Sequence, residues 1–348
     1  MLPLNRILVT GPGEFKNRII PIPDLLSKYH MDYTVFFQKT LTDLGYNVVG
    51  VWNAFDPPYN HHHGWPLKLP DVEFGPRTLL VMHFQDFVTI QNDRVVELDQ
   101  VAQHYGKHAN QVLVTHMHPD LEKFYTGPVN LIEFSNHNYR EISRLRDRWP
   151  EWKHILEQPR TQAWQCLNGR MCDHRRRVAN ILCDWPNGTL SYGTAIPLDE
   201  WAYNTYRGTE NDENFVRLGK IYGSCAVNIV TETLYDHAPG LFCEKTLFAM
   251  LAEQIPIVIG SQGLVSSLQD RGFDMFDDLV DISYDCLPNE TRLTAALESN
   301  QDLIVGKIDL APYRERLRAQ RKFLLDDYPA IMELRFIRDC EQISNLNL

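Results

Sequence analysis

Charged residues follow an apolar run in the second half of the chain. The run 227–231 leads into Glu232, and Glu244 with Lys245 opens a helical pattern that leads to the apolar run Ile255–Ile259. A helix N-terminus carries unpaired N–H groups and a partial positive charge, to which a lysine adds a full one. Such a corner suits a diphosphate, and a carboxylate beside it suits ribose hydroxyls. The alternative is that Glu244 only favours the first helical turn and Lys245 is a solvated surface charge.

An arginine-rich segment at 170–183 has helical spacing. At 100° per residue, Arg170, His174 and Arg177 share one face, beside an apolar stripe. Three potential cations next to a buried stripe repel one another unless an anion lies between them, so this face also suggests phosphate binding. The alternative is that the arginine run is an ordinary solvated face. The stripe consists of Met171, Val178 and Leu182, and the run of Arg175, Arg176 and Arg177.

Histidines and aspartates crowd the first half. One strand-like run ends at His83, and Asp86 follows it closely. A second run is followed by His116 and Asp120. Because the carboxyl ends of parallel strands meet at one edge, we expect these groups to gather there. A neutral histidine or a carboxylate at that edge suits the general base that an acceptor hydroxyl needs. A metal site at His116 and His118 is an alternative that lacks a third ligand, and several of these histidines would be loop residues without a catalytic part.

The second half resembles a known family in order and spacing. Thr231-Glu232, Cys243–Thr246 and Ile255–Gly260 are similar to the C-terminal donor-binding motif of the fucosyltransferase-like glycosyltransferases. That motif has an acidic residue ending a strand, a Thr-Glu-Lys helix start and a Val-Pro-Val-type strand ending in Gly. The segments 263–276 and 283–285 resemble the downstream part of viral and bacterial relatives. Their Asn-x-Arg…His-Arg segment is matched by Asn168, Arg170, His174 and Arg175.

The resemblance implies a GT-B architecture, in which two Rossmann-like domains face each other across a cleft. Carried over, Glu244 would bind the donor ribose, Lys245 its phosphates, and Arg170 or Arg175 would neutralise the leaving diphosphate. His174 and Glu232 join this set of donor-binding candidates. The resemblance also implies inversion at the sugar, and we expect neither a metal ion nor another cofactor. Leu241 and Cys243 stand where the family often has Tyr and Thr, which leaves base stacking and donor identity open.

The elements that must position these residues follow from apolar periodicity. Short apolar runs alternating with helical patterns predict an α/β fold with a parallel sheet in each half. We expect two Rossmann-like domains, 1–160 on the acceptor side and 161–310 for the nucleotide-sugar, and a helical tail at 311–348. The strand-like runs are 6–10, 47–52, 78–83, 111–115, 129–133, 163–166, 225–231 and 255–259. The helical patterns are 25–44, 170–183, 245–253, 264–270 and the tail from Pro312, and 53–76 reads as a long loop.

Composition narrows the function classes. The 348 residues are 44% hydrophobic, which suffices for a sizeable core, and the net charge of −11 provides no chain-wide basic field for a polyanion. Only a local strip, Arg140 to Arg148, could meet a nucleic acid backbone. The seven cysteines have no disulfide or zinc spacing, and neither a signal peptide nor a membrane-spanning run is indicated, so we expect a cytoplasmic protein with reduced thiols.

The resemblance to the fucosyltransferase-like family implies a glycosyltransferase that moves a sugar from a nucleotide-sugar to a hydroxyl of a glycan or another acceptor. One alternative is a phage transferase acting on modified bases in DNA. Another is a nucleotide-sugar or carbohydrate-binding protein without turnover. The sugar, the nucleobase, the acceptor and the oligomeric state stay open.

Overall fold

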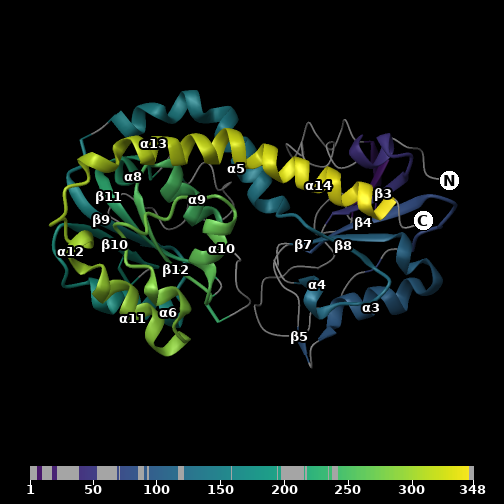
Figure 1. Ribbon diagram of the computed structural model, residues 1–348, viewed down its shortest axis with the longest axis horizontal. Helices are drawn as coiled ribbons and strands as arrows, with labels where there is room; N and C mark the ends of the chain where they lie inside the picture. Colours follow the sequence, from purple (N-terminus) through teal and green to yellow (C-terminus); the bar gives the residue numbers. More distant parts are fainter. Residues whose placement is uncertain are drawn as a thin grey trace. The chain divides into compact units, whose positions relative to one another are not determined.

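The chain divides into two compact units, which are treated separately below. The first comprises Met1–Arg140 with Ile331–Leu348, and the second Glu141–Ala330. The computed structural model (Figure 1) describes residues 6–9, 18–21, 39–52, 69, 71–84, 90–91, 94–116, 121–157, 159–193, 195–196, 215, 218–233, 235–236 and 242–344.

The first unit contains a six-stranded sheet in the order β2-β1-β3-β4-β7-β8. All neighbours pair in parallel except β2, an antiparallel edge strand. Its strands are β1 (Arg6–Val9), β2 (Arg18–Pro21), β3 (Asn47–Trp52), β4 (Thr78–Phe84), β7 (Val112–His116) and β8 (Asn130–Glu133). A small hairpin of β5 (Ile90–Gln91) and β6 (Arg94–Val95) precedes α3 (Val96–Tyr105), and α4 (Leu121–Phe124) follows β7. Leu98 and Val101 of α3 join one buried cluster with Leu80, Val112 and Val114 of the sheet.

The second unit contains a four-stranded, fully parallel sheet in the order β10-β9-β11-β12. The strands are β9 (Gln162–Asn168), β10 (Gly188–Tyr192), β11 (Cys225–Thr231) and β12 (Ile255–Ile259). From β9 the chain first moves outward to β10 and then returns to place β11 on the other side of β9. The direction of winding therefore reverses between β9 and β11, and open α/β sheets bind ligands at such a point.

Helices cover both faces of the second sheet, as right-handed crossovers require. The crossovers from β9 to β10 and from β11 to β12 run in opposite directions, so their helices lie on opposite faces. Helix α6 (Asp173–Leu182) therefore shares its face with α11 (Asn289–Ser299), and α9 (Glu244–Leu251) lies on the other with α13 (Arg314–Lys322), as Figure 1 shows. Three shorter helices complete this unit: α8 (Gly219–Ser224), α10 (Leu264–Asp270) and α12 (Gln301–Ile304).

Two long helices connect the units along the chain. Helix α5 (Asn136–Trp152) contains the boundary at Arg140, and α14 (Tyr328–Ser344) follows α13 through a π-helical turn at Phe323–Asp327 and contains the second boundary. Within the first unit, Phe336 of α14 packs on Phe134, and Tyr139 donates a hydrogen bond to Glu333. Among the described helices, none has both the length and the apolar character that a membrane crossing requires.

The predicted α/β class and its two sheets are confirmed, and the strands 47–52, 225–231 and 255–259 and the helix 264–270 match their predicted bounds. Two features differ. The units separate near residue 140 instead of 160, and the tail from 311 is divided between them at residue 330. Strands β2 and β10 have no counterpart among the predicted runs. Most of the predicted helix 25–44 and loop 53–76 lies outside the described residues.

A close approach of backbone to side chain fixes the start of β10. Gly188 pairs with Trp164 of β9, and a Cβ at Gly188 would lie 1.8 Å from Cε2 of this buried ring. The Trp164 indole is held in place because its Nε1 donates to the carbonyl oxygen of Pro186 at 2.9 Å. The position therefore requires glycine for space.

We predict that Gly188→Ala lowers the stability of the second unit by about 1–3 kcal/mol, the usual cost of overpacking. Thermal unfolding measures this loss. A second change, Trp164→Val, removes all the ring atoms that clash, so adding Gly188→Ala should cost less in the Trp164→Val background than in the wild type. An unchanged melting temperature in Gly188→Ala would contradict the packing described here.

Candidate functional site

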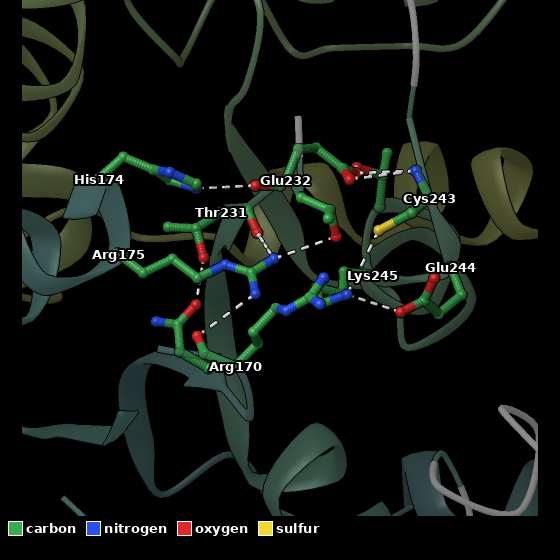
Figure 2. A network of polar contacts seen from close by, with 11 residues as sticks. Arg170, His174, Arg175, Thr231, Glu232, Cys243, Glu244 and Lys245 are labelled. Atoms are coloured by element: carbon green, nitrogen blue, oxygen red, sulfur yellow. Dashed lines mark hydrogen bonds and ion pairs between the residues drawn. The ribbon is translucent and has the colours of Figure 1, made fainter. Parts of the chain in front are cut away.

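The residues expected to bind the donor gather at the reversal point of the second sheet. Arg170, His174 and Arg175 follow β9, Glu232 follows β11, and Glu244 and Lys245 open α9. Figure 2 shows these six side chains around the carboxyl ends of β9 and β11. Residues far apart in sequence, such as His174 and Glu232, which are 58 positions apart, thus meet because parallel strands end at the same edge.

Arg175 is buried, unlike a residue of the solvated arginine run that was the alternative interpretation. Its side chain is 1% exposed, and Nη2 donates to the carbonyl oxygen of Thr231 at 2.9 Å and to Oγ1 of Thr233 at 3.3 Å. Nη1 lies 3.5 Å from the carbonyl oxygen of Arg170. The guanidinium therefore binds the backbone around the end of β11, and the alternative of a solvated face is excluded for Arg175.

Arg170 is exposed and lies in the turn before α6, because this helix begins only at Asp173. The predicted helical face shared by Arg170, His174 and Arg177 is therefore wrong, and Met171 is solvent-exposed instead of part of the apolar stripe. Arg177 donates to the carbonyl oxygen of Glu290 at 2.9 Å. In Figure 2 the Arg170 side chain points toward Lys245.

His174 is a neutral hydrogen-bond donor. Its Nε2 lies 2.9 Å from the carbonyl oxygen of Glu232, so this nitrogen carries the proton, and the ring stacks on Tyr235 at 4.9 Å between centroids. Burial lowers the pKa of His174 to about 4, the hydrogen bond to Glu232 opposes the shift, and the positive charge of Arg175 adds to it. His174 therefore positions the residues after β11 and carries no charge for a phosphate at pH 7.

Glu232 is buried at the N-terminus of α9. The residue is 1% exposed. Both of its carboxylate oxygens lie 3.1 Å from the backbone N of Cys243, the N-cap of the helix. Oε1 also accepts a hydrogen bond from Oγ1 of Thr246 at 2.5 Å. A carboxylate here accepts hydrogen bonds from donors of the first turn and interacts favourably with the positive end of the helix dipole.

Glu244 and Lys245 form an ion pair of 2.6 Å at the start of the same helix, with side chains 18% and 19% exposed. Burial alone lowers the pKa of Lys245, but the negative charges of the Glu244 and Glu232 carboxylates oppose this effect, and the pKa is raised. The ammonium is therefore charged. Burial raises the pKa of the Cys243 thiol, as do the carboxylates of Glu232 and Glu244, so this group stays protonated beside Nζ of Lys245 at 3.4 Å.

The candidates for the general base lie in the first unit. His83 belongs to β4 and His116 ends the adjacent strand β7, where Phe84 pairs with His116, so the two strands end at one edge. The side chain of His116 is 1% exposed. Asp86, His118 and Asp120 lie outside the described residues, and their predicted role stays a prediction. Within the described part, no three His, Cys, Asp or Glu side chains are grouped as a metal would need.

The sequence did not indicate a role for Thr246, Tyr235 or Arg292. Arg292 of α11 is buried, its Nε donates to the carbonyl oxygen of Gly260 and its Nη2 to that of Tyr235, both at 3.0 Å, and its guanidinium lies 4.7 Å from the Tyr235 ring. Of these three, only Thr246 lies within a motif of the sequence analysis, Cys243–Thr246. A small polar side chain in the first turn of a helix is a signal that it bonds a group near the helix N-terminus. No pattern distinguished Arg292 from a surface residue.

The chain matches no family model, no curated protein and no solved structure. The resemblance to the fucosyltransferase-like enzymes thus depends on the quoted motifs, and any function must be argued from the geometry of this site.

The low pKa of His174 predicts a pH dependence of stability. An unfolded histidine has a pKa near 6.5, so between pH 6.5 and about 4 the unfolded chain binds more protons at this position than the folded one. The contribution of His174 is complete above pH 6.5 and is lost as the pH falls toward 4, by about 3 kcal/mol in total.

We predict that His174→Gln, which retains an N–H donor but does not titrate, makes the free energy of unfolding less dependent on pH between 7 and 4.5. Urea unfolding at both pH values measures this, and the exposed His154, changed in the same way, serves as the control. An NMR titration that places the midpoint of the His174 ring near 6.5 would contradict the buried, neutral state.

Proposed function

We propose that the protein is a glycosyltransferase that moves a sugar from a nucleotide-sugar to a hydroxyl acceptor, with the donor held by the second unit. The observation that carries the proposal is the position of Arg170, Glu244 and Lys245 at the reversal point of a parallel sheet, beside a helix N-terminus. The same position binds nucleotide phosphates in other open α/β folds.

Charge favours an anion at this site. Arg170, Arg175 and Lys245 oppose the carboxylates of Glu232 and Glu244, and three positive charges minus two negative ones leave one positive charge. Arg175 acts on Lys245 electrostatically, in the direction that lowers the lysine pKa. A diphosphate near Arg170 and Lys245 would relieve this repulsion.

In the proposed mechanism Lys245 and Arg170 are the phosphate ligands. The bond from the sugar to the diphosphate breaks with its electrons moving to the diphosphate, and fixed cations stabilise the charge that grows there. The resemblance implies that Arg175 could also bind the phosphates. Its guanidinium instead donates to backbone carbonyl oxygens, so Arg175 contributes positive charge to the site without contacting the phosphates in this proposal. Glu244 is assigned to the ribose, because a carboxylate accepts hydrogen bonds from ribose hydroxyls.

The acceptor and the general base belong to the first unit in this proposal, with the two units facing each other as in GT-B enzymes. The base takes the proton of the acceptor hydroxyl as that oxygen attacks the sugar, which inverts the anomeric carbon. A base must contact the hydroxyl, and the burial of His116 is unfavourable for that role. His83, Asp86 and Asp120 stay candidates.

An experiment must distinguish sugar transfer from the alternative function, binding of a nucleotide-sugar without turnover. Hydrolysis or transfer of the sugar from a panel of nucleotide-sugars shows turnover, whereas a thermal shift with nucleoside diphosphates alone shows only binding. Retention of DNA at low salt and its release at moderate salt would instead favour a DNA-modifying transferase.

We predict that Lys245→Ala weakens nucleoside diphosphate binding by about 1.5–3 kcal/mol, the range for hydrogen bonds to charged groups. Calorimetric titration measures the affinity. Lys322→Ala is the matched control, because Lys322 is an exposed lysine of α13. Equal affinities of the two folded variants would remove Lys245 from the site.

Donor binding and transfer should survive chelation by EDTA, because cationic side chains are positioned to neutralise the diphosphate. The activity assay is repeated with EDTA and then with added Mg²⁺ or Mn²⁺. A complete loss of transfer that one divalent ion restores would contradict the metal-free mechanism proposed here.

A further inference from the structure

We infer that Glu232 is a positioning residue: through Cys243 and Thr246 it fixes the first turn of α9 to the end of β11 and thereby sets the position of Lys245. The inference deepens the proposed function and rests on it for the role of Lys245. It replaces the expectation that Glu232 binds the donor itself.

The first step of the argument is that Glu232 is not accessible to a ligand. The residue is 1% exposed, and its two oxygens together accept from the N–H of Cys243 and the hydroxyl of Thr246. A ribose could reach this carboxylate only after the first turn of α9 had lost these bonds. Glu244 at the same corner is 18% exposed, and its carboxylate is paired with Lys245.

The second step is that Glu232 is itself held rigidly. Its backbone N donates to the carbonyl oxygen of Ile259 in β12 at 2.9 Å, and its own carbonyl oxygen accepts from His174 at 2.9 Å. Arg175 binds the preceding residue, Thr231, through the carbonyl oxygen at 2.9 Å. The carboxylate therefore extends from a backbone that is fixed by β12 on one side and by α6 on the other.

The third step is that the tie acts on the first turn of α9. The helix is separated from β11 by 12 residues, its buried residues 246–251 hold its body against the core, and Glu232 bonds the first turn directly. Lys245 is the second residue of α9, so its direction follows the position and rotation of the first turn. A displacement of about 1 Å at a reacting or binding group can cost a factor of about 100, so this tie has functional weight.

Thr246 provides a clean test, because valine has the same shape as threonine but no hydroxyl. Thr246 is fully buried and lies one residue after Lys245, and its hydroxyl donates to Oε1 of Glu232. Thr246→Val removes one donor to Glu232 and nothing else from the site. Thr246→Ser keeps the hydroxyl and loses a methyl group, so it is the matched control.

Two measurements are made on the full chain. Hydrogen exchange of the ligand-free protein reports the first turn of α9, residues 243–247, and calorimetric titration with inorganic pyrophosphate reports the anion site. We expect Thr246→Val to speed exchange in this turn and to weaken pyrophosphate binding, each about tenfold or more, as the loss of a hydrogen bond to a charged group implies. Thr246→Ser should remain within about threefold of the wild type in both.

The outcomes separate this inference from the proposed function. Exchange in residues 243–247 that Thr246→Val does not change overturns the positioning role, whatever the affinity. Faster exchange with unchanged pyrophosphate binding also overturns it, because the turn would then have no effect on Lys245. Faster exchange in a protein whose wild type binds neither pyrophosphate nor any nucleoside diphosphate supports the tie between Glu232 and α9 but refutes the proposed function.

Discussion

The second unit depends on a buried carboxylate that ends a parallel strand. Glu232 meets the N-terminus of α9, where the helix dipole and an unpaired N–H favour a negative charge, and it does so without solvent. Placing a carboxylate there is costly unless its oxygens are bonded, so the strand end and the helix start must come together for the fold to form. The same constraint that stabilises this corner also decides where Lys245 lies.

Buried arginines complete the edge of the sheet. Strands that end at one edge present carbonyl oxygens there, and a guanidinium has five donors with which to bind them. Arg175 binds the carbonyl of Thr231, and Arg292 binds that of Gly260 after β12. The positively charged side chains at this edge therefore have two tasks. Arg175 and Arg292 bind the backbone, whereas Arg170 and Lys245 are exposed enough to contact a ligand.

Much of the second sheet could be predicted from the sequence, because strands buried on both faces appear as continuous apolar runs. Ile255–Ile259 is such a run, and all five residues are buried. Strand β10, with Gly188 and Ser191, has no such run and was missed. Arg175 was misplaced for another reason: the helical pattern was started at Arg170, whereas α6 begins at Asp173, and a carbonyl partner 56 residues away leaves no local signal. The motif that contains Glu244 and Lys245 can be recognised because its spacing is local, and the donor-binding role of these two residues stays a prediction. The contacts of Glu232 are tertiary and leave no local pattern.

The most direct measurement is a hydrogen-exchange comparison of the protein with and without the nucleoside diphosphate that stabilises it best in a thermal-shift screen. We predict slower exchange in two segments, the turn from β9 to α6 at 168–176 and the start of α9 at 242–248, since these carry Arg170 and Lys245. Slower exchange confined to other segments, or no stabilisation by any nucleoside diphosphate, would contradict the central claim that this edge of the sheet binds the donor.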